Sequence, residues 1–194
     1  MHQVTEWRSY HGSHTTSEFD QQPAVKWTPQ RTGHSRHVSK SIFIPPIQIA
    51  GWIHILDADP QENWDGIRFH LGHIGNNRNY ILDMVRPDNH MTISREYGWR
   101  DYDDLARDTQ GLDLIEGGTY VFQIVWEYED ALLDGIHFEI ANETATKTLS
   151  AEVELEANQG DHEGSHVPRL PVGSIGWRLD HINAVGQVAV RELY

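Results

Sequence analysis

The sequence predicts a single all-β domain made of two antiparallel sheets packed face to face. Apolar and polar residues alternate with a period of two in most segments after residue 37, which is typical of strands with one buried face. Turn-forming residues separate these segments at short intervals. No segment shows the 3.6-residue period of an amphipathic helix. We therefore expect about nine to eleven short strands, as in a sandwich or barrel.

The composition limits the chemistry that the protein can use. The chain has 194 residues and a hydrophobic fraction of 38%, which suffices for one core. It contains no cysteine, which excludes disulfides, thiolate zinc sites, iron–sulfur clusters and cysteine nucleophiles.

The charge and the chain start bear on partners and location. The formal net charge is −14, so we expect neither nucleic-acid nor anionic-membrane binding. The first residues lack the basic and apolar regions of a secretory signal, and no run reaches the roughly 20 apolar residues of a membrane span. These features predict a soluble cytoplasmic protein.

Residues 1–37 are polar and weakly periodic. They predict an irregular N-terminal arm with one or two edge strands, held by its aromatic residues against a domain of residues 38–194. The arm carries five of the 13 histidines, and their spacing does not match a metal site, so we expect them in surface loops. These histidines are His2, His11, His14, His34 and His37.

The first clear strands follow this arm. Residues 42–44 precede Pro45 and Pro46, which mark a bend or a strand edge because proline cannot donate a ladder hydrogen bond. In residues 47–56, every second position is isoleucine or glycine, and the positions between them include Trp52. In residues 67–71, Arg68 and His70 share one face and the apolar residues share the other.

Three further predictions concern hairpins. Residues 80–86 and 90–96 form a strand, a turn and a strand, and residues 119–128 pair with residues 136–140 across a loop at Asp134-Gly135. A last hairpin joins residues 174–179 to residues 185–193. Residues 146–155 form one more strand. The segments 98–118 and 157–171 are polar connections, with one helical turn expected at 102–107.

The order of these segments resembles the concanavalin A-like jelly-roll domains of lectin, glucanase and laminin-G type. The resemblance covers residues 38–194. Its carriers are the glycine-led strand openings at 117–120 and 135–140, the closing strands at 172–179 and 188–193, and the hairpin at 80–96. It implies a two-sheet jelly-roll sandwich whose members mostly bind or cut carbohydrates on the concave sheet, although fold alone does not carry function.

Glycoside hydrolysis is disfavoured. Such enzymes need two carboxylates about 5 Å apart when they retain configuration. Glu127 and Glu129 fall at a strand end, and Glu152 and Glu154 point to one face of a strand, where a solvated surface explains them better.

A polysaccharide lyase is an alternative. In lyases of this fold, arginine, glutamine, histidine and tyrosine on the concave sheet neutralise a carboxylate and abstract a proton. Neighbouring strands of this chain could supply Arg68, His70, Arg95, Gln123 and His137. The local motifs of the lyases are absent.

Aromatic residues offer another kind of site. Trp52, Trp64, Trp99 and Tyr97 could stack on sugar rings. Trp126 and Trp177 lie on the apolar faces of their strands and are expected in the core. A closed-pocket cyclase or isomerase would be lined by apolar residues, with His70, Asp83 or His137 as acid or base, and an ordinary core would give the same pattern. Those apolar residues are Trp52, Phe69, Met84, Met91 and Trp126.

Metal binding is the weaker interpretation. The segments 57–59, 101–104 and 160–163 offer the oxygen ligands that calcium takes, but none matches an EF-hand loop and solvated acids explain them better. We therefore expect no cofactor, with calcium left open.

Our first hypothesis is a non-catalytic ligand-binding sandwich directed at carbohydrate or another small molecule. Its expected ligand-binding residues are Trp52, Trp64, Arg68, Arg95, Gln123 and Trp99. If the protein is an enzyme, His70 and His137 are the expected catalytic residues. A structural subunit of a virion-like assembly is the third hypothesis, and a homo-oligomer is left open.

Overall fold

The protein is a sandwich of fifteen described strands and no described helix. A computed structural model describes residues 1–29, 33–58, 66–73, 79–85, 89–98, 101–128, 133–154 and 173–193. The strands are β1 (His2–Gln3), β2 (Trp7–Tyr10), β3 (Gly12–Phe19), β4 (Gln22–Pro29), β5 (His34–Ser39), β6 (Ile47–Ala58), β7 (Gly66–His73), β8 (Asn79–Val85), β9 (His90–Gly98), β10 (Asp101–Asp108), β11 (Thr119–Tyr128), β12 (Leu133–Ala141), β13 (Thr146–Glu154), β14 (Ser174–Asp180) and β15 (Ile182–Glu192).

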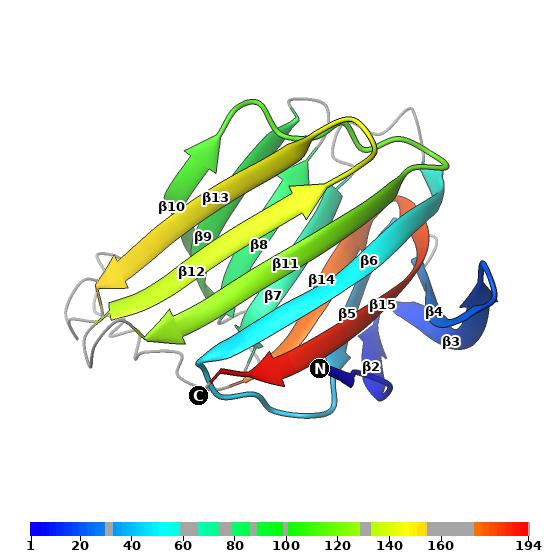
Figure 1. Cartoon of the computed structure of the whole chain (residues 1–194), viewed down its shortest axis with the longest axis horizontal. Coiled ribbons are helices and arrows are strands. Elements are labelled where there is room, and N and C mark those ends of the chain that lie inside the picture. The colour runs from blue at the N-terminus through cyan, green and yellow to red at the C-terminus, as the bar shows by residue number, and fades with distance from the viewer. Residues whose placement is uncertain are drawn as a thin grey trace.

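The strands form two antiparallel sheets that lie one behind the other (Figure 1). The eight-stranded sheet has the order β13-β12-β11-β6-β15-β4-β3, with β1 added to β15. The seven-stranded sheet has the order β10-β9-β8-β7-β14-β5-β2. The chain therefore crosses between the two sheets several times. The prediction of an all-β domain with two antiparallel sheets is confirmed. The predicted hairpins β8–β9 and β11–β12 are confirmed.

The core lies between the sheets and follows the predicted alternation. In β11, Tyr120, Phe122, Ile124 and Trp126 are buried, whereas the residues between them face outward. The prediction that Trp126 and Trp177 belong to the core is confirmed, because both are almost fully buried. Packing of such large rings supplies much of the hydrophobic stabilisation of a sandwich.

The N-terminal residues form more regular structure than the one or two edge strands expected. Strands β2 and β5 extend the seven-stranded sheet, and β3 and β4 extend the eight-stranded sheet. Trp7 and Trp27 pack against Trp177 at ring-centroid distances of 6.1 and 4.2 Å. His37, expected in a surface loop, is instead buried beside Trp27, because its strand turns that side chain inward.

Two local predictions are wrong. Residues 102–107 lie in strand β10, which pairs with β9, and not in a helical turn. Strands β14 and β15 do not form a hairpin, because they belong to different sheets and the chain crosses between them at His181, whose φ is 57°. The part of the chain that the structure describes contains no helix, and hence none that is long and apolar enough to cross a membrane.

Candidate functional site

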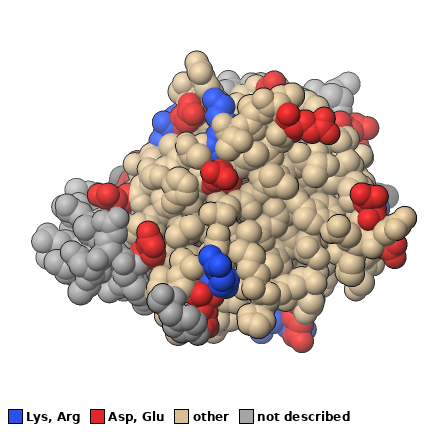
Figure 2. All heavy atoms as spheres, viewed as in Figure 1, with Lys and Arg blue, Asp and Glu red and all other residues tan. Residues whose placement is uncertain are grey.

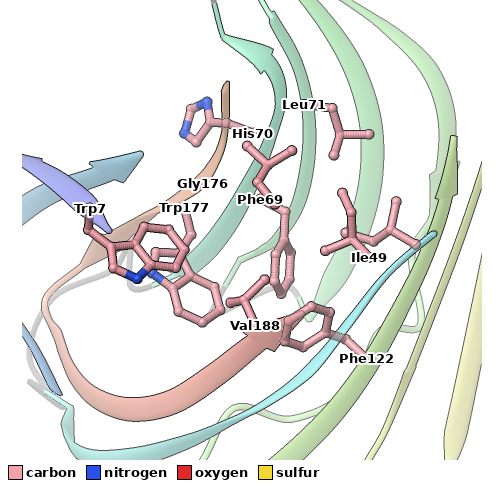
Figure 3. A pocket seen from close by; sticks show the side chains of 11 residues that line it. Trp7, Ile49, Phe69, His70, Leu71, Phe122, Gly176, Trp177 and Val188 are labelled. Atoms are coloured by element: carbon pink, nitrogen blue, oxygen red, sulfur yellow. The ribbon is translucent and has the colours of Figure 1, made fainter. Parts of the chain in front are cut away.

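The outer face of the seven-stranded sheet carries several buried and half-buried polar side chains. In β7, Ile67, Phe69 and Leu71 point into the core, so Arg68 and His70 point outward, as the alternation predicts. Figure 3 shows the His70 ring on the other side of β7 from Phe69. Neighbouring strands add their own outward residues to this face.

Three arginines stand side by side across this face. Arg36 of β5 is in register with Arg178 of β14, and Arg178 is in register with Arg68 of β7. We call Arg36, Arg178 and Arg68 the arginine row. Burial lowers the pKa of Arg36; Glu96 and Asp180 oppose this shift, whereas Arg178 and Arg68 add to it. The three guanidinium groups are thus close enough to repel one another.

Carboxylates partly balance the arginine row. The Arg178 Nε donates to Asp180 Oδ1 at 2.7 Å, and the same oxygen lies 2.6 Å from Nδ1 of His34. Arg68 Nε lies 3.6 Å from Asp83 Oδ2 and 3.7 Å from Asp180 Oδ2, which is ion pairing without a hydrogen bond. Burial raises the pKa of Asp83, and Arg68 opposes this shift.

A chain of hydrogen bonds fixes His70. The Asn79 Nδ2 donates to Glu96 Oε2 at 2.7 Å, which turns the Asn79 Oδ1 toward Nδ1 of His70. We call His70, Asn79 and Glu96 the His70 relay. Burial lowers the pKa of His70 well below its ordinary value, so the ring is neutral at pH 7. Because its Nδ1–H donates to Asn79, its Nε2 is left as an acceptor.

The pKa values of His73 and Glu96, at the margins of this face, are also shifted. Burial lowers the pKa of His73 to about 4, and Arg36, whose Nη1 lies 3.4 Å from His73 Nε2, acts in the same direction. Burial raises the pKa of Glu96, and the hydrogen bond from Asn79 opposes it. This face therefore combines charged arginines and a neutral imidazole with carboxyl groups whose pKa values are raised by burial.

The remaining predicted residues of the sheets lie elsewhere. Trp52, Gln123 and His137 are on the outer face of the eight-stranded sheet, on the opposite side of the molecule from Arg68 and His70. The lyase hypothesis placed Gln123 and His137 on strands neighbouring those of Arg68 and His70, and the two sheets separate them. Figure 2 shows this opposite face, where charged atoms are scattered and broad areas are uncharged.

Aromatic rings of the described residues cluster on the opposite face. The Phe19 ring of the β3–β4 hairpin lies 5.4 Å from Trp52 and 4.5 Å from His54, measured between ring centroids. His137 Nδ1 is hydrogen-bonded to the Ser150 hydroxyl at 2.7 Å. Trp52 is half-buried under Phe19, so a sugar ring would meet only part of its surface.

Arg95 is not on either outer face. It is in register with Tyr80, a core residue, and therefore points to the inner side of the seven-stranded sheet. Its Nη2 lies 4.0 Å from Asp103 Oδ2 of the neighbouring strand β10. Arg95 therefore does not share a face with Arg68, because the two side chains leave the sheet in opposite directions, and its role as a ligand-binding residue stays a prediction.

Several predicted residues fall outside the described part of the chain. These are Asp59, Trp64, Trp99 and the segment 160–163, and the side chain of Tyr97 also lies outside it. Among the described acids of the calcium hypothesis, Asp103 pairs with Arg95, and Asp104 accepts from the Ser94 hydroxyl at 2.8 Å. The described residues hold no group of three histidine, aspartate or glutamate side chains placed to bind a metal ion.

The apolar pocket of the cyclase or isomerase hypothesis is an ordinary core. Phe69, Met84, Met91 and Trp126 are buried between the sheets, whereas Trp52 is outside. The cavity beside Phe69 and Trp177 in Figure 3 has a volume of about 10 Å³, which holds at most one water molecule. A substrate does not fit there.

Five residues of this face were not predicted as site residues from the sequence: Arg36, Arg178, Asp180, Asn79 and Glu96. Arg178 and Asp180 carried a usable signal, since they alternate with Trp177 and Leu179 in a predicted strand. No sequence pattern pointed to Arg36, because it lies in the segment expected to be an irregular arm.

The chain resembles known proteins in structure but not in sequence. No protein-family model matches the sequence, and no curated protein resembles it significantly. Among solved structures, a carbohydrate-binding module, CBM66 from Bacillus subtilis, superposes with a TM-score of 0.63 and 13% identity, over 99% of each chain. The fold is a concanavalin A-like jelly roll.

Other jelly rolls of this type agree. A legume lectin-like domain from Entamoeba histolytica gives a TM-score of 0.61 and 11% identity, over 97% of this chain and 91% of that domain. The PL-14 alginate lyase from Aplysia kurodai gives 0.58 and 7%, over 95% and 90%. The predicted resemblance is confirmed, and it extends through the N-terminal residues that the sequence analysis placed outside it. Identities this low establish the fold alone.

Proposed function

We propose that the protein binds carbohydrate on the outer face of the seven-stranded sheet, around the arginine row, without chemistry of its own. The observation that carries the proposal is the set of outward polar side chains on β5, β14, β7, β8 and β9, which hold one another in place. Arg178 is fixed by Asp180, Asp83 by Thr92, and His70 by Asn79.

This arrangement suits a polyhydroxylated ligand. Sugar hydroxyls both donate and accept, and the face offers guanidinium donors beside carboxylate and imidazole acceptors. Because these groups are already ordered, a ligand immobilises few side chains when it binds. The structural neighbours support the same conclusion, since a carbohydrate-binding module and a lectin-like domain share the jelly roll.

A glycan array tests the proposal. The wild-type chain should give saturable binding to at least one glycan class, and Arg178→Lys should weaken it about tenfold or more, because lysine keeps the charge but loses the planar fork of donors. Arg191→Gln is the matched control. Arg191 lies near the end of β15 in the other sheet and contacts Gln48, so this variant should bind like wild type. If Trp52→Ala loses binding and Arg178→Lys keeps it, the site lies on the outer face of the eight-stranded sheet and the proposal is wrong.

The same samples separate binding from catalysis. The structure is also compatible with the polysaccharide-lyase hypothesis, since His70 and Arg68 lie on the proposed face. A binder leaves the glycan chains intact after long incubation. A lyase cleaves them and leaves an unsaturated sugar at each broken linkage, which is detected by its new ultraviolet absorbance. Cleavage by wild type that is lost in His70→Gln would overturn the non-catalytic part of the proposal.

A further inference from the structure

The centre of the outer face of the eight-stranded sheet is rich in apolar side chains. We call the outward residues of ranges 137–141 in β12, 121–125 in β11, 48–52 in β6 and 187–191 in β15 the central patch; they alternate with residues that face the core. Half of them are apolar: Ala50, Trp52, Val121, Val125, Ala141 and Ala189. Val121 is 54% exposed. Apolar side chains gathered on an exposed face mark an interaction surface.

The face around the central patch is large enough for a stable interface. Strands β13, β12, β11, β6 and β15 lie side by side, and the shortest of them has 9 residues. Five strands at about 4.8 Å spacing, each about 30 Å long, cover roughly 700 Å². A standard protein–protein interface takes about 800 Å² from each partner. This face can therefore accommodate one partner of ordinary size.

Charge selects the kind of partner. The chain has a formal net charge of −14, so two copies repel each other wherever their acidic surfaces meet. The central patch, all of whose residues are described, holds one acid, Glu139, and one arginine, Arg191, and otherwise no aspartate, glutamate, lysine or arginine. Figure 2 shows the broad uncharged areas of this face. Two copies can therefore meet here without strong repulsion, whereas a highly charged partner finds no complementary surface.

The positions of the two charges define a symmetric pairing. Glu139 lies on β12 and Arg191 on β15, on either side of the central pair β11 and β6. When two patches meet face to face, a two-fold axis parallel to the strands, between β11 and β6, exchanges β12 with β15 and β11 with β6. Glu139 of each copy then lies over Ala189 of the other, about 7 Å along the strand from Arg191. The same operation places Trp52 over Val121 of the second copy.

We propose that two copies of this chain form a dimer through the central patch, around this two-fold axis. The two sheets pack face to face with aligned strands, about 10 Å apart. The contact covers Val121 with Trp52 and pairs Glu139 with Arg191, each of them twice. The seven-stranded sheet lies behind the eight-stranded sheet in each copy (Figure 1), so the dimer keeps both seven-stranded faces outward, on opposite sides.

Sedimentation equilibrium of the wild-type chain tests the proposal. We expect a dimer with a dissociation constant below about 10 μM, as an interface of ordinary size gives. Glu139→Arg and Arg191→Glu each place like charges opposite one another at both symmetry-related contacts. Because such contacts are strongly unfavourable, each variant should weaken the dimer about fiftyfold or more. Thermal melting shows whether each variant is folded.

Two further variants control for charge. Arg107→Glu changes the net charge by the same amount as Arg191→Glu, but on β10 at the edge of the other sheet, and it should dimerise like wild type. Arg191→Gln creates no contact between like charges. It should weaken the dimer less than about tenfold, because exposed ion pairs contribute little.

A mixture of the two charge-reversal variants tests the two-fold pairing itself. In a mixed dimer of Glu139→Arg with Arg191→Glu, both contacts again join opposite charges, so the equimolar mixture should dimerise within about threefold of wild type. Mixing cannot repair a folding defect. A dimer that persists in both single variants, or a mixture that stays monomeric, overturns the proposal. A wild-type chain that is monomeric at about 100 μM also overturns it and leaves the central patch to a different partner.

Discussion

On the seven-stranded sheet, some polar side chains point away from the core and are nevertheless buried. His70 is only 1% exposed although it faces away from the core. Asn79 accepts from His70 Nδ1 with its Oδ1 and donates to Glu96 with its Nδ2, so one amide orients two ionisable groups. A group buried without such partners costs stability, which makes Asn79 the residue on which the relay depends.

Replacement of Asn79 should therefore be costly. Asn79→Ala leaves His70 Nδ1 and Glu96 Oε2 without their shared partner, and we expect the free energy of unfolding to fall by about 1–3 kcal/mol. Urea denaturation measures this loss. Thr148→Ala, at an exposed position of β13, is the control and should change stability by less than about 0.5 kcal/mol. Equal stability of the two variants would contradict the relay.

His37 should make stability depend on pH. Burial lowers its pKa to about 4 from the ordinary 6.5, and nearby His14 acts in the same direction. The folded state thus resists protonation, so the contribution of the neutral ring is fully present above pH 6.5 and is lost as the pH falls toward 4. The expected slope in that window is about 1.4 kcal/mol per pH unit.

The variant His37→Gln isolates this contribution. Denaturation of wild type and variant at several pH values between 7 and 4 should show a shallower loss of stability in the variant. His73, Asp83 and Glu96 also titrate with shifted pKa values, but they are present in both proteins and cancel in the comparison. Parallel curves would show that His37 takes up its proton in the folded state.

Individual strands were largely predictable from their alternation, whereas their pairing was less so. The two faces of β7 and β11 follow directly from which residues are apolar. Strand β10 was missed because its polar sequence has no apolar face to detect. The β14–β15 hairpin was wrongly predicted because adjacency in sequence says nothing about a crossover between sheets.

A glycine in β6 shows how closely neighbouring strands of the eight-stranded sheet pack. Gly51 lies on the inner face between neighbouring strands, and a Cβ atom there would approach the Phe122 ring to 2.8 Å and meet the Gln187 carbonyl. We expect Gly51→Ala to lower the free energy of unfolding by about 1–3 kcal/mol through overpacking. The control is Ala50→Ser, whose side chain points outward on the same strand. A melting temperature for Gly51→Ala equal to that of wild type would show that the strand has room.

At the scale of the molecule, the fold was predicted better than the site. Periodicity tells which residues share one side of a strand, but strand order decides which strands share a sheet. Trp52, Gln123 and His137 were for this reason grouped with Arg68 and His70, although the sandwich separates them. The arginine row arises only when β5, β14 and β7 lie side by side, and those strands are far apart in sequence.

The central claim is that the ligand lies on the seven-stranded sheet. Hydrogen–deuterium exchange of the wild-type chain, with and without a saturating glycan, measures this directly. We expect added protection of backbone amides in β5, β7 and β14, with no change in β6, β11 and β12. Protection confined to β6, β11 and β12 would contradict it and move the site to the face around Trp52.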